Sequence, residues 1–332
     1  MAHELWIETA SGAASMFYVG QTPWHGLGKA LDSPATAAEA IKASNLGWNV
    51  WKEQLYVKQG DKHIQVNNRF AIMRPKQGNE SDDVALGIVG KEYVPLQNSE
   101  AFAFFDHIVG RNEAIYHTAG ALGKGERIWV LAKLPDSIQV VGDDISDKYL
   151  LLSNSHDGTS SVQIKFTPIR VVCNNTLTMA LSQGDTIRIP HNRDMDTLLK
   201  QSERTLGVIN RRFNDIEKVF KAMAGQQINK EQLETYLAKV FPFPKDSQDE
   251  NGQKRASDNR SLAEYLFDQG TGNRQHGVAG TLWAAYNGVT ELIDHRITKQ
   301  TRENKLNSIW FGDGYLIKAR AYRLAEGLLK AA

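Results

Sequence analysis

Two short stretches of the sequence concentrate side chains that can hydrogen-bond a ligand. The first is Ser-Asn-Ser-His-Asp-Gly at 153–158, and the second is Arg-Val-Val-Cys-Asn-Asn-Thr at 170–176. Each is flanked by an apolar segment typical of a strand. The Arg170 guanidinium can bind phosphate through paired hydrogen bonds, and amide and imidazole groups can meet a base edge or a partner's backbone. We therefore expect both stretches to lie around one solvent-filled site at the end of a sheet.

The binding of a nucleic-acid strand fits these residue types. Cationic side chains would follow the phosphates, and Trp129 or Tyr149 would stack on bases if exposed. The residues expected to bind nucleic acid are Asn154, His156, Lys165, Arg170, Asn174, Asn175, Arg188 and Arg193.

Both stretches also suit a purely structural role, and this alternative stays open. In that interpretation 153–158 is a strand that runs into a turn. His156 and Asp157 would bond backbone amides there, and Gly158 would adopt the left-handed conformation. Arg170 would then form a structural salt bridge.

Catalysis and metal binding find less support. Cys173, His156, Asp157 and His191 supply a thiol, bases and a carboxylate. However, Cys173 ends an apolar segment, where a packed, inert thiol is common. The histidines are scattered without the short spacing of metal ligands. We expect neither an enzyme nor a cofactor.

A glycine cluster at 120–125 surrounds Lys124. Glycines supply the positive φ angles of a hairpin turn, so the cluster predicts a turn before the strand at 127–134. A phosphate cradle is the alternative, but these glycines do not open a helix after a strand.

Composition limits the function further. The 332 residues include 39 basic and 38 acidic side chains, so the net charge of +1 argues against coating nucleic acid by bulk charge. One cysteine cannot form an internal disulfide. Because the sequence has no apolar run of membrane-spanning length and no leader pattern, we expect a cytoplasmic protein.

The order of the expected elements predicts an α+β fold: an antiparallel sheet with crossing helices, followed by a long amphipathic helix and a helical C-terminal region. We divide the chain into an N-terminal arm at 1–45, a sheet core at 46–194 and a helical region at 195–332. The arm holds a Trp-His-Gly-Leu-Gly loop and a short helix. A charged linker is expected near 245–256.

The long helix, at 195–223, has apolar residues every seven positions. It can pack in the core or against a second subunit. Trp24 likewise can plug the sheet or dock on a neighbour. The expected residues of an oligomer interface are Trp24, Leu206 and Phe213.

Beyond 295 the sequence becomes basic, with eight Lys or Arg against three acidic residues, interleaved with aromatic residues such as Trp310 and Phe311. This mixture suits a nucleic-acid strand, because cations neutralise phosphates and rings stack on bases at about 1–3 kcal/mol each. It equally suits a solvated helix whose rings face the core. The secondary candidates are Lys318, Arg320 and Arg323.

Several motifs along the chain resemble those of the phage/plasmid-like protein family, domain of unknown function 932. They lie at 1–5, 16–20, 23–28, 93–98 with Phe102 and Asp106, 153–158, 170–177, 286–290 and 294–295. The resemblance implies a protein carried by phages, prophages or plasmids, and it implies no activity. The expected arrangement of sheet and helices also resembles, more distantly, the core of phage single-strand annealing recombinases. No residue is transferred from those proteins.

The leading hypothesis is a mobile-element protein that binds single-stranded DNA, with strand annealing in recombination or replication by a homo-oligomer as its extension. The alternative is a non-catalytic effector that binds a host protein, such as an inhibitor of host defence. An enzyme using Cys173 or His156 is a weaker third hypothesis.

Overall fold

The computed structural model describes residues 14–19, 28–33, 35–109, 115–170, 175–176, 187–192, 197, 202–297 and 308–331. Its larger sheet has the strand order β11-β10-β8-β7-β6-β1-β2, with β9 paired to β8 and β12 paired to β9. The pairs are antiparallel except for β1 with β2. These strands are β1 (Met16–Val19), β2 (Lys29–Leu31), β6 (Ile115–Leu122), β7 (Arg127–Val141), β8 (Asp144–Ser155), β9 (Val162–Phe166), β10 (Ile169–Arg170), β11 (Asn175–Thr176) and β12 (Ile187–Ile189).

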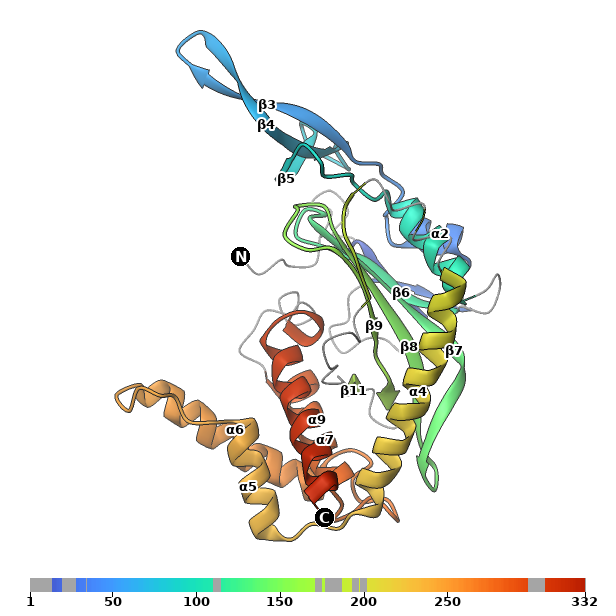
Figure 1. The fold of residues 1–332 in the computed structure, drawn as a ribbon, viewed down its shortest axis with the longest axis vertical. Coiled ribbons are helices and arrows are strands. Elements are labelled where there is room, and N and C mark those ends of the chain that lie inside the picture. The colour runs from blue at the N-terminus through green and yellow to red at the C-terminus, as the bar shows by residue number, and fades with distance from the viewer. Residues whose placement is uncertain are drawn as a thin grey trace.

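Alternation along the strands gives this sheet two apolar faces. Ile128, Val130 and Ala132 of β7 face the main core, which is covered by α1 (Ala37–Ala43), α2 (Asn98–Val109) and α4 (Ser202–Gly225). Trp129 and Leu131 face the opposite side and pack with Ile309 and Trp310. In Figure 1, α2 and α4 run along one side of the sheet and α9 (Asp313–Ala331) lies on the other.

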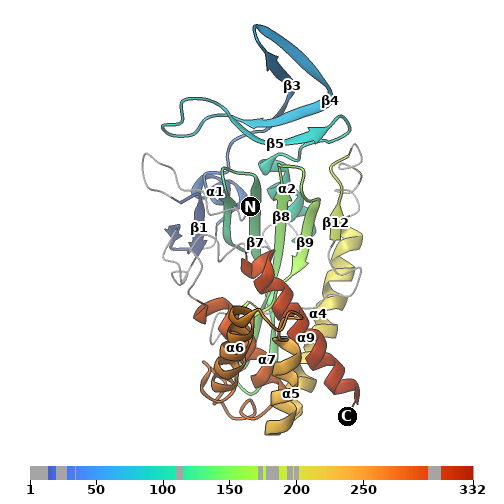
Figure 2. The same ribbon diagram turned by 90° about the vertical axis from the view of Figure 1, so that its left-hand side faces the viewer.

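A smaller antiparallel sheet projects from one end of the molecule. It consists of β3 (Trp51–Gln59), β4 (Lys62–Arg74) and β5 (Val84–Gly90). Because β5 ends opposite Arg69, the remainder of β4 pairs only with β3 and forms a two-stranded ribbon. Figures 1 and 2 show this ribbon extending beyond the rest of the chain.

Close backbone contact joins the two sheets. A Cβ built on Gly87 would lie 2.4 Å from the Cα of Asp157, in the turn after β8. Nearby, the buried Arg74 donates two hydrogen bonds to the Glu80 carboxylate, at 2.7 and 2.8 Å, and a third to the Lys124 carbonyl at 2.6 Å. The small sheet is therefore held against the turns at one end of the large sheet.

The C-terminal region is helical, as expected. It comprises α4, α5 (Lys230–Val240), α6 (Glu250–Gln269), α7 (Leu282–Glu291), the π-helix η1 (Leu292–Arg296) and α9. Every residue of α7 is buried, and the Trp283 indole donates to the Asp144 carboxylate at 2.7 Å, which links α7 to β8. Across the described ranges, no helix is both long and apolar enough to cross a membrane.

The structure confirms the α+β fold, and two local expectations differ. The segment at 245–256 is irregular only as far as Asp249, whose side chain caps α6 by accepting from the Gly252 amide at 2.9 Å. Its buried stripe begins with the small residues Gly252 and Ala256, which produce little apolar periodicity in the sequence.

Phe213 is not available to a second subunit. Its side chain is fully buried in the core of the same chain, with the Lys148 ammonium 5.7 Å from its ring centre. The prediction that Phe213 forms an oligomer interface is therefore wrong. Trp24 and the Leu206 side chain lie outside the described residues.

Candidate functional site

The described residues of the two polar stretches do not form one site. Arg170 pairs with Ser146, near the start of β8, whereas the first stretch begins at Ser153 near its end. The eight residue steps from Ser146 to Asn154 span roughly 26 Å of extended strand. The reason is that β9 and β10 run antiparallel to β8, so residues that follow the turn by a dozen positions have returned to the far end of the strand.

Asn154 and His156 are structural. Asn154 is buried and donates to the Leu96 carbonyl at 3.3 Å, while the His156 Nε2 lies 3.0 Å from the Asn98 Oδ1. Burial lowers the pKa of His156 to about 3, so its imidazole is neutral. Both side chains are shielded from solvent, and the prediction that they contact nucleic acid is wrong.

Other expected contacts are also buried. Trp129 and Tyr149 lie in the core, so neither can stack on a base, and Trp129 instead packs edge-on against Trp310 with ring centres 4.6 Å apart. Lys318 is fully buried in an ion pair with Asp294 at 2.7 Å, which removes it from the nucleic-acid candidates. Lys318 is buried because it lies on the side of α9 that faces the protein interior.

The remaining candidates are placed only in part. Arg320 donates to the Val240 carbonyl at 3.0 Å, and Arg323 and Arg188 are exposed. Only the backbones of Arg170 and Asn175 are described, in β10 and β11. Asn174, Arg193 and Cys173 lie outside the described residues.

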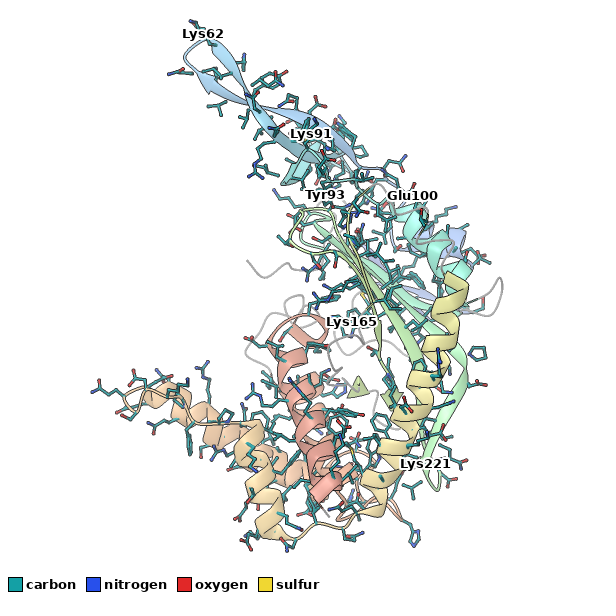
Figure 3. All side chains as sticks on the ribbon, viewed as in Figure 1. Lys62, Lys91, Tyr93, Glu100, Lys165 and Lys221 are labelled. Carbon is teal, nitrogen blue, oxygen red and sulfur yellow. The ribbon has the colours of Figure 1, made fainter. Side chains whose placement is uncertain are left out.

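Lys165 lies in a polar pocket on the sheet face opposite α2 and α4. The pocket has a volume of about 220 Å³ and is lined by Arg127, Ser153, Thr159, Ser160, Gln163, Lys165 and Phe311. Figure 3 shows Lys165 on the side of the sheet that faces α9. Six of the lining residues come from β7, β8, β9 and the β8–β9 turn, and Phe311 comes from the segment just before α9.

Strand register explains why these side chains meet. Lys165 pairs with Leu151, Gln163 pairs with Ser153, and Arg127 pairs with Ser155. Positions 151, 153 and 155 point to the same face because side chains alternate along a strand. Phe311 is brought to this face by its neighbour Trp310, which packs on Trp129.

Two cations share one aromatic ring in this pocket. The Arg127 guanidinium and the Lys165 ammonium each lie 5.0 Å from the Phe311 ring centre, and the Lys165 Nζ lies 4.3 Å from the ring centre of Tyr315. Lys165 also donates to the Trp310 carbonyl at 3.3 Å. The faces of these aromatic rings carry partial negative charge, which offsets part of the positive charge of the two cations.

The electrostatics of the pocket favour an anion. Burial lowers the pKa of Lys165 to about 8, and the positive charges of Arg127 and Arg188 add to this effect. Burial also lowers the pKa of Arg127, which the Asp157 carboxylate opposes. Within the described ranges, neither cation forms an ion pair with a carboxylate. A bound anion would relieve the repulsion between the two cations.

Hydroxyl and amide groups complete the site. Ser160 accepts from the Gln163 amide at 2.7 Å, and the Thr159 hydroxyl donates to Asp157 at 2.7 Å. Together with Ser153 they surround the cations with groups that can hydrogen-bond a phosphate or carboxylate. A cluster of side chains suited to hold a metal ion is not found among the residues that the structure describes.

Of the residues that line this pocket, the sequence predicted Lys165 as a binding residue and Ser153 as part of a polar stretch, and it did not predict the others as site residues. Ser153, Gln163 and Lys165 interrupt apolar strands at alternate positions, and this signal was available. Arg127 directly follows the predicted glycine turn, which the structure confirms as the β6–β7 hairpin. The contribution of Phe311, 184 positions after Arg127, required the tertiary structure.

Comparisons with known proteins identify a family without an activity. The family model described as "Domain of unknown function (DUF932)" matches residues 85–310. The UPF0380 protein YafZ of Escherichia coli (strain K12) is 32% identical over 90 residues, which are 27% of this chain and 32% of that protein. The UPF0380 protein YfjQ of the same organism is 35% identical over 74 residues, 22% of this chain and 26% of that protein. The chain thus matches about a third or less of the length of these relatives, and no solved structure matches it.

Proposed function

This chain belongs to the family of domain of unknown function 932, and from the geometry of its polar pocket we propose that it binds single-stranded DNA. A backbone phosphate occupies the pocket between Arg127, Lys165 and Phe311. The observation that carries the proposal is the pair of cations held at 5.0 Å from one ring and surrounded by hydroxyl and amide groups.

A phosphodiester suits this pocket chemically. Its single negative charge lies between two positive ones, and its two free oxygens can accept from the guanidinium and the ammonium. Arg188, exposed on β12, pairs in register with Gln163 and extends the positive charge beyond the pocket. A flexible single strand can bend a phosphate into a recess of about 220 Å³. A stiff duplex, with a persistence length of about 150 base pairs, does so at a greater cost.

Binding of a fluorescent oligonucleotide at several salt concentrations tests the proposal. We expect the affinity to fall as salt rises, with a logarithmic slope of roughly 0.7 for each phosphate neutralised. The double variant Arg127→Gln with Lys165→Gln is expected to bind at least about tenfold more weakly, because charge-assisted hydrogen bonds contribute about 1.5–3 kcal/mol each.

Lys239→Ala is the control, because Lys239 is exposed on α5 and remote in sequence from the pocket. Unfolding curves of all variants separate lost binding from lost folding. Salt-independent binding, or an unchanged affinity of the double variant, would overturn the proposal.

Strand annealing is the extension of this proposal. An annealing protein must present two strands at once, so one pocket per chain calls for several copies. We expect the native mass to rise when oligonucleotide is added and complementary strands to anneal faster with the protein. A monomeric complex that does not accelerate annealing would restrict the function to binding.

A protein partner is the second candidate. Exposed apolar side chains concentrate on the small sheet, at Tyr56, Val57, Ile64 and Ile88, and such patches mark interaction sites. Under this alternative, a host protein stays bound after nuclease treatment and is lost from a Val57→Ser, Ile64→Ser variant. Loss of the partner on nuclease treatment alone would favour nucleic acid as the bridge.

A further inference from the structure

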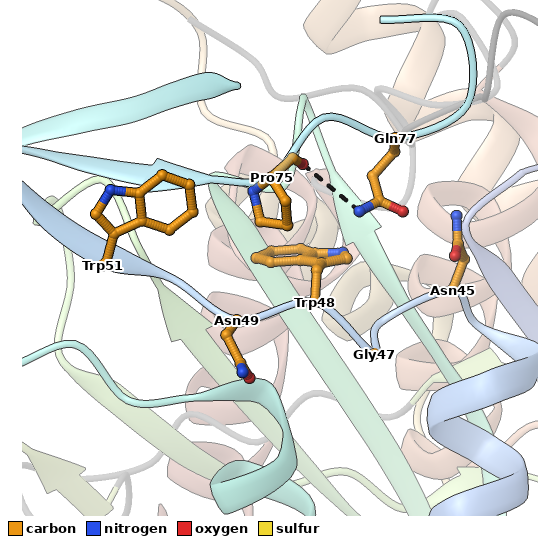
Figure 4. Close-up of a pocket in the computed structure, with 7 residues that line it drawn as sticks. All are labelled: Asn45, Gly47, Trp48, Asn49, Trp51, Pro75 and Gln77. Carbon is orange, nitrogen blue, oxygen red and sulfur yellow. Dashed lines mark hydrogen bonds between the residues drawn. The ribbon is translucent and has the colours of Figure 1, made fainter. Parts of the chain in front are cut away.

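A second pocket lies where α1 leads into the small sheet. It is lined by Asn45, Gly47, Trp48, Asn49, Trp51, Pro75 and Gln77, with a volume of about 540 Å³. This volume is within the range of roughly 300–1,000 Å³ that is typical of small-molecule sites. Figure 4 shows the Trp48 ring beneath Pro75, with Trp51 to one side and the amides of Gln77 and Asn45 to the other.

The local backbone opens this pocket. Asn45 has a φ of 55°, and its left-handed conformation reverses the chain after α1. The chain then reaches the buried Trp48, while the Gln77 amide donates weakly to the Pro75 carbonyl at 3.5 Å. The carbonyl group of the Gln77 amide is left to face the pocket beside Asn45 (Figure 4).

One polar atom at the pocket lacks a partner. The Trp48 Nε1 is buried, and in the part of the chain that the structure describes it makes no hydrogen bond. Buried donors are normally paired, and this one, which has almost no exposed surface, can meet an acceptor in the pocket only if neighbouring side chains move aside. This observation is independent of the amides that line the opening.

We propose that this pocket binds an unpaired nucleobase of the strand whose phosphate occupies the Lys165 pocket; the inference therefore rests on the proposed function. The partly exposed Trp51 ring offers the flat apolar surface on which bases stack, whereas the Trp48 ring is buried beneath Pro75 (Figure 4). The primary amides of Asn45, Asn49 and Gln77 each pair a donor with an acceptor, which is the pattern that meets a base edge.

The two pockets flank the same turn. A Cβ built on Gly125 would lie 3.0 Å from the Trp48 ring, and Gly125 precedes Arg127 by two residues, or at most roughly 7 Å of chain. Arg74 connects them as well, since its guanidinium lies 5.9 Å from the Trp48 ring centre and donates to the Lys124 carbonyl. Lys124 is exposed in this turn. A strand passing this turn can place a phosphate in one pocket and a base in the other.

Two strands of equal length, one of thymidine nucleotides and one abasic, separate the two sites. The wild-type protein is expected to bind the base-bearing strand at least about fivefold more tightly, the lower limit of one stacked base. Gln77→Ala and Asn45→Gly are expected to remove this preference and leave the affinity for the abasic strand unchanged. Glycine retains the positive φ of position 45.

Gln248→Ala, an exposed amide in the loop before α6, serves as the matched control. Equal wild-type affinity for the two strands, or a preference that survives both pocket variants, would overturn the nucleobase site and leave the phosphate site standing. Failure to bind either strand would overturn both. Circular dichroism identifies any variant that does not fold. If one of the two pocket variants fails to fold, the strand preference of the other one tests the nucleobase site.

Discussion

At the scale of single residues, the Lys165 ammonium can bind an anion, but burying its charge lowers the stability of the folded protein. The Lys165 pKa of about 8 shows that the folded protein holds this proton less tightly than the unfolded chain does. The charge therefore reduces stability below pH 8, and the cost disappears as the pH rises toward the ordinary value of 10.5. A side chain retained at such a cost is typical of function.

Lys165→Met is expected to separate stability from binding. Methionine has a similar length and carries no charge, so the free energy of unfolding at pH 7 should rise by about 1–2 kcal/mol. Affinity for single-stranded DNA should fall about tenfold or more. Thermal or denaturant unfolding measures the change in stability, and the fluorescence anisotropy of a labelled oligonucleotide measures the change in affinity. A destabilised variant with unchanged binding would contradict both the electrostatics and the assigned role.

Binding should also depend on pH. The Lys165 ammonium is charged below pH 8 and neutral above it, so the affinity for an anion is retained at low pH and lost as the pH rises through 8. Between pH 7 and pH 9 we expect about a tenfold loss if the charged form alone binds. An abasic strand is the probe, since its phosphates do not titrate in this range.

Lys165→Arg is the control for this pH dependence, because a guanidinium stays charged throughout the range. Its affinity should be flat between pH 7 and pH 9. A wild-type profile without a fall near pH 8 would show that Lys165 does not bind the strand.

At the scale of elements, the contact between the two sheets depends on backbone approach at a glycine. Gly87 of β5 faces the turn after β8 so closely that a Cβ would lie 2.4 Å from the Cα of Asp157, whereas a Cβ on Gly90 would meet nothing within 4 Å. Both glycines belong to one strand, so they make a matched pair.

Gly87→Ala is expected to lower the free energy of unfolding by about 1–3 kcal/mol, because the backbone of the turn must move to admit the methyl group. Gly90→Ala should change it little. Thermal unfolding of the two variants measures the difference. Equal stability would mean that the small sheet is not anchored at this turn.

At the scale of the whole molecule, a net charge of +1 means that any attraction to nucleic acid comes from the arrangement of charges. The outer ribbon illustrates this, since Lys58 and Lys62 are exposed there against Asp61, and Arg69 is exposed at its base. Figure 3 shows Lys62 at the tip of the ribbon, far from Lys221 on α4. A DNA strand bound at the Lys165 pocket can therefore also be attracted by the positive charge of the ribbon.

The double variant Lys58→Glu with Lys62→Glu is therefore expected to weaken strand binding several-fold at low salt, with a smaller loss at high salt because exposed charges are screened. Lys245→Glu with Lys254→Glu, at two exposed positions in and before α6, is the control with the same change in net charge. Equal losses for the ribbon and control variants would show that the ribbon does not contact the strand.

Some features of this protein followed from the sequence by itself. The α+β class, the helical C-terminal region and the β6–β7 hairpin were predictable because periodicity and turn chemistry are local. These features depend on residues within a few positions of one another. The binding role expected for Lys165 stays a prediction, and its burial was not visible in the sequence.

Tertiary structure alone decided which polar residues share a site. The antiparallel register carried Arg170 to the far end of β8, away from Asn154, although both lie in adjacent polar stretches. Long-range packing buried His156 and Lys318, and it brought Phe311 against Arg127 across 184 positions. The physical reason is that burial and pairing depend on how whole elements pack, and sequence separation along a hairpin does not measure distance in space.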